Sequence, residues 1–332
     1  MREAIKQRCD LLIENWKLIH KGFWLENGSL AAIAAAAYAD KGQTADVERL
    51  KECHKILKKK EGIFSEFRGN SELIVSSKMA LSSDPERYLE DVTGVYAKFQ
   101  KDKFWGSSYR ALAAMTICDV GKASEADAVI EKTNEIMKGM NKTHPFLTSD
   151  EDTSFAVLLA ISDKKTEDIL EELEEIYKSL KKKFSLHDNA VFSLSQVLAS
   201  YAGNAQDKAD KAIEIFDAFA AAGAKYGKGY ELASLGTLIG LGAGPEDIAS
   251  EVAEAADYLK GNRGFGAFDM GKATRLMFGT MIVAGDNSDE NYKVGASVIS
   301  GTVARVIAEQ TAMMVAIMAA STSSATTSSS SN

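Results

Sequence analysis

Residues 144–183 read HPFLTSDEDTSFAVLLAISDKKTEDILEELEEIYKSLKKK and contain one copy of the unit from which the chain is built. Within this unit, residues 166–183 carry apolar side chains at three- and four-residue steps, with glutamates and lysines on the opposite face. This periodicity predicts an amphipathic helix. Residues 155–162 (FAVLLAIS) are apolar nearly all round, which predicts a helix that other parts of the protein enclose. One unit is therefore a hairpin of an outer helix and an enclosed inner helix.

The amphipathic helix recurs along the chain with a period of about 40 residues. Its copies are ENWKLI (14–19), ECHKIL (52–57), GVYAKF (94–99), EIMKGM (135–140), EIYKSL (175–180), EIFDAF (214–219) and EAADYL (254–259). The third position of each copy is Trp16, His54, Tyr96, Met137, Tyr177, Phe216 and Ala256, at successive spacings of 38, 42, 41, 40, 39 and 40 residues. Such regular spacing is typical of a repeat architecture. The sequence predicts about seven tandem helical hairpins.

The two connections within each unit differ in length and composition. The link from an inner helix to the next outer helix is short, as in residues 162–168 and 242–247. The link back is longer and rich in glycine and aromatic residues, in the segments 21–29, 62–71, 102–109, 144–152, 184–189, 225–230 and 264–271. If the inner helices run parallel to one another, these long loops share one rim, where free N–H groups and the positive ends of helix dipoles gather.

These features predict an all-α fold, either a closed α/α toroid or a curved helical-repeat solenoid. The toroid is favoured because uniformly apolar inner helices leave little polar concave surface. Residues 1–320 are expected to form a single domain, in which residues 288–320 form a last helical segment that caps the core. The Ser/Thr-rich tail 321–332 has too few apolar residues to fold and is expected to be disordered.

Composition excludes several classes of function. The net charge of −8 gives no basic footprint for nucleic acid. Three widely spaced cysteines predict neither a disulfide framework nor a cysteine-rich zinc site. The first residues do not resemble a signal peptide, and no apolar run is long enough to cross a bilayer. We therefore expect a cytoplasmic protein with no cofactor, since no nucleotide-binding or zinc-protease motif occurs, and we do not expect a membrane as a partner.

Four stretches carry a family resemblance, namely IFSEFRGNSELI (63–74), HPFLTSDEDTSFAVLLA (144–160), YELASLGTLIGL (230–241) and GKATRLMFG (271–279). With them the chain resembles an uncharacterised bacterial family catalogued as domain of unknown function number four thousand and three. The resemblance implies a single domain in a bacterial, cytoplasmic setting. It implies no activity, cofactor or catalytic residue.

Candidate catalytic residues lie in the long loops and at the start of the last inner helix. The run Asp150-Glu151-Asp152 could hold Mg²⁺ or act as a general acid and base. The alternative is that Asp152 or Thr153 caps the inner helix while its neighbours are solvated. His187 could be a general base oriented by Asp188, or Asp188 could be a cap. With capping favoured in both cases, no metal site is predicted. The catalytic candidates are Asp150, Asp152, His187 and Arg275.

Candidate ligand-binding residues are aromatic or cationic. The cations could bind an anionic group on the rim, with solvated charges or local ion pairs as the alternative. The aromatic residues could line a pocket, with anchoring of the loops beneath the inner helices as the alternative. The candidates are Trp24, Arg68, Trp105, Lys228, Tyr230 and Phe268.

The function predicted from the sequence is a helical-repeat scaffold. It would bind a peptide, a protein segment or a small anionic ligand at the loop rim or in the central hollow. The alternative is an α/α-toroid enzyme, either a carbohydrate-active hydrolase or lyase or a metal-assisted transferase, that uses carboxylates of the rim.

Overall fold

Helices alternate between an outer and an inner layer in the computed structural model of the chain, which describes residues 1–63, 65–101, 103–286, 311 and 314–315. The outer helices are α1 (Glu3–Gly22), α3 (Val47–Lys60), α5 (Pro85–Gln100), α7 (Ala126–Thr143), α9 (Thr166–Lys181), α11 (Ala205–Ala221) and α13 (Pro245–Lys260). The inner helices are α2 (Gly28–Asp40), α4 (Glu72–Leu81), α6 (Ser108–Asp119), α8 (Thr153–Ala160), α10 (Asp188–Ala199), α12 (Leu232–Leu235) and α14 (Lys272–Asp286). Those residues contain no strand, and the predicted all-α class is confirmed.

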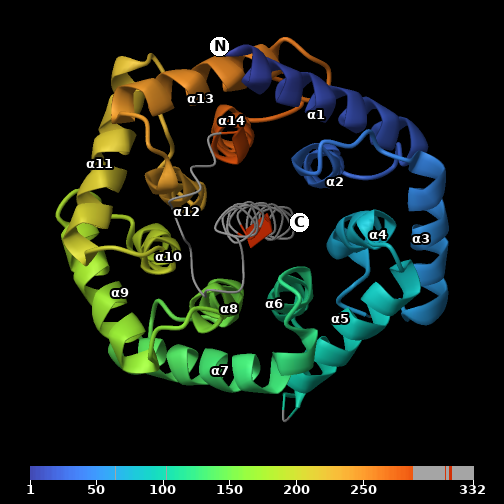
Figure 1. Cartoon of the computed structure of the whole chain (residues 1–332), viewed down its shortest axis with the longest axis horizontal. Helices are drawn as coiled ribbons and strands as arrows, with labels where there is room; N and C mark the ends of the chain where they lie inside the picture. The colour runs from blue at the N-terminus through green and yellow to red at the C-terminus, as the bar shows by residue number, and fades with distance from the viewer. Residues whose placement is uncertain (64, 102, 287–310, 312–313, 316–332) are drawn as a thin grey trace, which may run out of the picture.

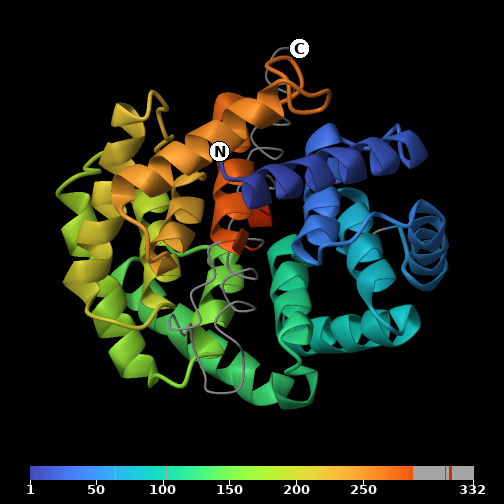
Figure 2. The ribbon, with the colours of Figure 1, turned by 45° about the horizontal axis from the view of Figure 1, so that its top comes forward.

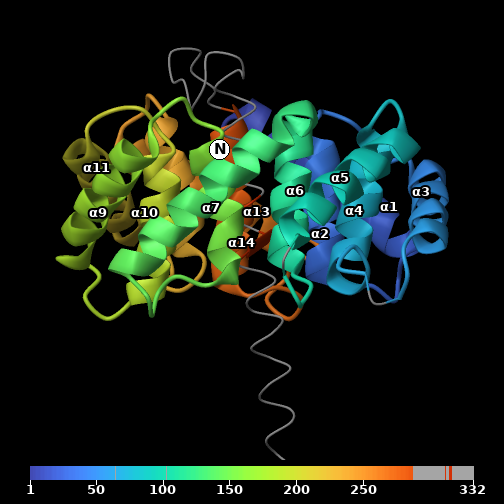
Figure 3. The ribbon, with the colours of Figure 1, turned by 90° about the horizontal axis from the view of Figure 1, so that it is seen from below.

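The seven hairpins are arranged as a ring (Figure 1), with the inner helices running between two rims when the ring is seen from the side (Figure 3). The first outer helix, α1, packs beside the last one, α13 (Figure 2). Arg2 Nη2 donates to Glu251 Oε2 at 3.0 Å, and the Tyr258 hydroxyl donates to Asp10 Oδ1 at 2.6 Å. The described helices therefore form a ring rather than an open solenoid, and we refer to the hairpins as units one to seven.

Buried apolar side chains explain why the layers form. The inner helix α2 buries Leu30, Ile33 and the alanines between them, whereas α9 buries only one stripe that includes Ile169 and Leu173. Each inner helix contacts its own outer helix and at least one neighbouring inner helix, so little of its surface is left for polar residues. The apolar composition of the inner helices follows from this position.

The inner helix of unit six is shorter than residues 232–241 predict. It is α-helical only over Leu232–Leu235 and continues as the 3₁₀ helix η4 (Gly236–Gly240). A Cβ atom at Gly236 would lie 2.9 Å from side-chain atoms of Leu194 and Val197 on α10. Glycine therefore allows close packing of these inner helices, at the expense of regular α-helix.

Polar side chains of the outer helices bind the carbonyl ends of the inner helices on the rim of short links. Arg49 donates to the carbonyl oxygens of Ala80 and Ser82, both at 2.7 Å. Lys132 and Lys211 bind the carboxyl ends of α8 and η4 in the same way. Since these contacts supply donors to carbonyls that lack a helical partner, they fix the inner helices in a common direction.

Three further helices are short, and one predicted feature lies mostly outside the described residues. The short 3₁₀ helices are η1 (Gly69–Ser71), η2 (Ala123–Glu125) and η3 (Asp150–Asp152). Of the predicted cap 288–320, the structure describes Thr311, Met314 and Val315, and all three are buried. Met314 lines a cavity with residues of the inner helices α2, α4 and α14. The predicted tail 321–332 lies outside the described residues.

Candidate functional site

The long loops meet on one rim, and five of the seven pack on the next unit through an aromatic pair. One member comes from a long loop, and the other is the third position of the sequence repeat in the following outer helix. The pairs and the distances between their ring centroids are Phe23–His54 (5.2 Å), Phe67–Tyr96 (5.2 Å), His144–Tyr177 (4.7 Å), Phe184–Phe216 (4.9 Å) and Phe265–Trp16 (6.0 Å). The last pair joins unit seven to unit one. The contact that links successive units therefore also closes the ring.

The same loops carry a second set of apolar side chains, which point into solvent. These side chains are between 40% and 106% exposed, and we call them the crown: Trp24, Leu25, Ile63, Phe104, Trp105, Phe146, Leu186, Tyr230 and Phe268. Every long loop contributes at least one of them. Among the described residues the only other exposed large hydrophobic is Met1, so exposed apolar surface is concentrated on this rim.

The ligand-binding candidates lie in three kinds of surroundings, namely the crown, a local ion pair and a cation–π contact. Trp24, Trp105, Tyr230 and Phe268 belong to the crown. Arg68 is engaged within its own loop, since its Nε donates to Glu72 Oε2 at 2.8 Å and its Nη1 to the Glu61 carbonyl at 3.2 Å.

Lys228 is exposed, and its ammonium lies over one ring of its own unit and one ring of the preceding unit. The Nζ atom is 5.6 Å from the centroid of Phe216 and 5.9 Å from that of Phe184. This contact is of the cation–π type. It ties loop six to loop five.

Asp150 and Asp152 have local structural partners. Asp150 Oδ1 lies 3.3 Å from Arg110 Nε. Asp152 is buried in a capping box with Ser149, whose N–H donates to Oδ2 at 2.8 Å, and Gln196 Nε2 donates to Oδ1 at 2.6 Å. Burial raises the pKa of Asp152 to about 6, although these hydrogen bonds oppose the shift. Asp152 is therefore the third residue of the capping box of η3, and its side chain makes no capping hydrogen bond at the start of α8.

Arg275 and His187 lie in different surroundings. Arg275 is 6% exposed, and its Nη1 donates to the carbonyls of Phe265 at 3.2 Å and Gly266 at 3.3 Å. Its guanidinium therefore holds loop seven and does not extend from the rim. His187 precedes α10 without a capping hydrogen bond, while Asp188 is the first residue of that helix and pairs with Lys181. The structure does not bring the four catalytic candidates together at one point.

A cluster that the sequence did not indicate surrounds Glu72 at the start of α4. His54 Nε2, Lys58 Nζ and Arg68 Nε lie 3.1, 3.1 and 2.8 Å from its carboxylate oxygens. Burial alone would raise the pKa of Glu72, but hydrogen bonds from Arg68 and Lys58 together with the charge of His54 hold it below its usual value. The four-residue spacings of His54 to Lys58 and of Arg68 to Glu72 are the only sequence signal of this cluster.

Three side chains from units three, four and six interact on the crown rim. Burial and a hydrogen bond to the charged Glu151 raise the pKa of Tyr109 to about 12. Burial and the same carboxylate also raise the pKa of Tyr230. Because Tyr230 is separated from Glu151 by more than a full repeat, only the packing of the units brings the two side chains within electrostatic range.

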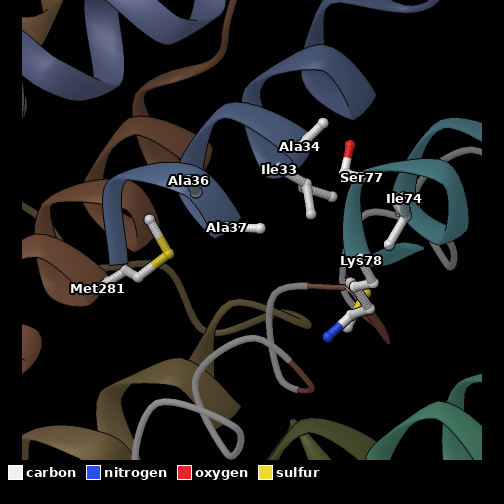
Figure 4. Close-up of a pocket in the computed structure, with 9 residues that line it drawn as sticks. Ile33, Ala34, Ala36, Ala37, Ile74, Ser77, Lys78 and Met281 are labelled. Carbon is white, nitrogen blue, oxygen red and sulfur yellow. The ribbon is translucent and has the colours of Figure 1, made fainter. Parts of the chain in front are cut away.

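The centre of the ring leaves little open space near α2 and α4. A cavity of about 10 Å³ is lined by Ile33, Ala34, Ala36, Ala37, Ile74, Ser77, Lys78, Met281 and Met314 (Figure 4). This volume holds one water molecule at most. Lys78, the one charged residue of the lining, forms an ion pair with Asp119. This part of the central hollow is too small for a peptide.

The described residues contain no group of three or more His, Cys, Asp or Glu side chains that could hold a metal ion. Within the same part of the chain, no helix has the length and hydropathy needed to cross a membrane. No curated protein and no solved structure matches the chain. Residues 15–312 match the family described as protein of unknown function (DUF4003), so the match covers most of the sequence. The chain belongs to this family.

Proposed function

We propose that this protein is a binding scaffold that engages its target through the crown. The observation that carries the proposal is the concentration of exposed apolar side chains on one rim. Nine large apolar side chains are exposed on this rim, against Met1 alone elsewhere in the described structure, and this one-sided distribution favours a binding role for the rim. The loops do not need these side chains for their own folding, because separate buried residues such as Phe67 and Phe265 anchor them.

Two other sites have less support. The cavity beside α2 and α4, lined in part by Met281 and Met314, has a volume of only about 10 Å³. An enzyme of the hydrolase or lyase type needs carboxylates that face a common cleft. Asp150 pairs with Arg110 and Asp152 is buried in its capping box, so neither supplies this arrangement. The crown is therefore the site that we favour among those predicted from the sequence.

Photo-crosslinking in cells that naturally make the protein tests this proposal. A photoreactive amino acid replaces Trp105 or Phe268 on the crown and, as matched controls, Gln43 or Ala202 in the exposed short links of the other rim. We expect crosslinks to a lipid or protein target from the crown positions and not from the control positions. Equal crosslinking from both rims, or none from the crown, would contradict the proposal.

A further inference from the structure

The crown is surrounded by cations, several of which form no ion pair within the described part of the chain. Six of the seven outer helices have a basic residue in their last turn, at the crown rim, and all seven have an acidic residue in their first turn, at the opposite rim. Exposed crown-rim cations that form no ion pair with the described residues are Lys59, Lys101, Lys103, Lys142, Lys182, Lys225, Arg263 and Lys272. The protein is therefore electrically polarised despite its net charge of −8.

Carboxylates on the crown rim cancel only part of this positive charge. Glu26, Glu66, Glu151, Glu231 and Asp269 form no ion pair with the described residues, but several others are paired or buried. Glu72 pairs with Lys58 and Arg68, Asp150 pairs with Arg110, and Asp188 pairs with Lys181. Asp152 is buried. A target that approaches the crown therefore meets apolar side chains set among free ammonium and guanidinium groups.

The crown side chains are spread around the ring and extend one by one. Phe104, Phe146 and Phe268 come from three different loops and are each almost fully exposed. A groove of about 1170 Å³ lies beside α5 and α7, but no crown side chain lines it. A protein partner needs a continuous, complementary patch. Separate apolar side chains suit a fluid surface, into which each one inserts independently.

We propose that the crown docks on the surface of an anionic lipid bilayer, with the ring lying on the membrane. This inference rests on the proposed function and names its target. The aromatic side chains would enter the headgroup region, which favours tryptophan and other amphipathic rings, while the free lysines would meet the negative surface potential. Association would be peripheral, because no described helix could cross the membrane.

The protein carries its own probe for a test of this proposal. Of its three tryptophans, Trp24 and Trp105 belong to the crown and are 70% and 84% exposed, whereas Trp16 is buried. The full chain is mixed with vesicles of phosphatidylcholine alone or of phosphatidylcholine with phosphatidylglycerol. We expect co-sedimentation with the anionic vesicles, a blue shift of tryptophan emission and weaker quenching by acrylamide. Salt should reduce the binding, since it screens the charges.

Two double variants separate the apolar and the electrostatic contributions. F104S/F268S keeps both probe tryptophans and should lower vesicle partitioning by about tenfold for each ring lost. K101Q/K103Q should also weaken binding to the anionic vesicles. The matched control K41Q/K165Q makes the same charge change at exposed lysines of the opposite rim and should bind like the unaltered protein. Because all six residues are exposed, the variants should keep the melting temperature of the parent chain.

Three results would overturn the inference. They are no sedimentation with either vesicle, equal sedimentation with both, or equal losses in the crown and control variants. If vesicles fail to bind while crosslinks from the crown lead to a protein, the lipid target is wrong and the proposed scaffold function stands. If crosslinks do not favour the crown, the proposed function itself fails.

Discussion

Replacement of Asp152 by asparagine should remove the loss of folding stability that this buried carboxyl group causes as pH rises. The carboxyl group is 2% exposed, and burial raises its pKa from 3.8 to about 6. Between these two values the folded state binds more protons than the unfolded state, so this group lowers the stability of the fold as pH rises. One pKa unit corresponds to about 1.4 kcal/mol. Between pH 4 and pH 7, ionisation of Asp152 should therefore lower the free energy of unfolding by about 2 kcal/mol. The rest of the effect falls below pH 4.

Asparagine can occupy the same position without a charge. Its oxygen can accept the bond from the Ser149 N–H, and its amide can donate to Gln196 if that side chain turns over. Gln196 Oε1 has no hydrogen-bond partner in the described structure, so it is available as an acceptor. We expect D152N to match the parent chain near pH 4 and to be more stable by about 2 kcal/mol at pH 7.

Urea unfolding followed by circular dichroism at several pH values measures this effect. The relevant quantity is the difference in unfolding free energy between the two proteins, because the other titrating groups are common to both. D150N provides a matched control, since it makes the same substitution two residues away in a carboxyl group that is half exposed. A difference that does not change with pH, or a D152N protein that is less stable at pH 7, would refute the account of a carboxyl group destabilised by burial.

Three further predictions concern the ring and its polar contacts. F265A removes a fully buried ring that contacts Trp16 and Phe278 and should lower the free energy of unfolding by about 3–5 kcal/mol. Amide hydrogen exchange should rise more in α1 and α14 than in α7. A uniform rise would argue against a role of Phe265 in closing the ring. K132M leaves the carbonyls of Ser162 and Lys164 without their donor and should cost about 1–3 kcal/mol in thermal or urea unfolding, whereas K132R should recover part of the loss. E172Q removes the charged partner of the buried Lys208 and should lower the free energy of unfolding by about 3–5 kcal/mol. Adding K208M to E172Q should restore stability. No restoration would show that the unpaired charge of Lys208 does not cause the loss.

Sequence patterns predicted the helical elements well because they depend on local periodicity. The apolar run at residues 155–162 and the amphipathic run at 166–183 lie on α8 and α9. The inner helix of unit six was predicted too long, because the need for close contact at Gly236 comes from α10 and not from its own sequence.

Within the loops the sequence indicated the right residue types without separating their roles. The aromatic residues of the loops divide between the two roles that the sequence left open. Phe265 is a buried anchor, whereas Phe268 is fully exposed. The two residues are three positions apart, and composition alone gives no sign of which one faces the next unit. The same limit applies to cations, since Arg275 is buried against backbone carbonyls and Arg263 is exposed.

The sequence by itself determined the hairpin, its period and the enclosed character of the inner helices, because each depends on side chains a few residues apart in the chain. Only the tertiary structure decided that unit seven meets unit one, that Tyr230 lies within electrostatic range of Glu151, and that the crown forms on one rim. Those features depend on small rotations between successive hairpins, which add up around the ring and leave no local mark in the sequence.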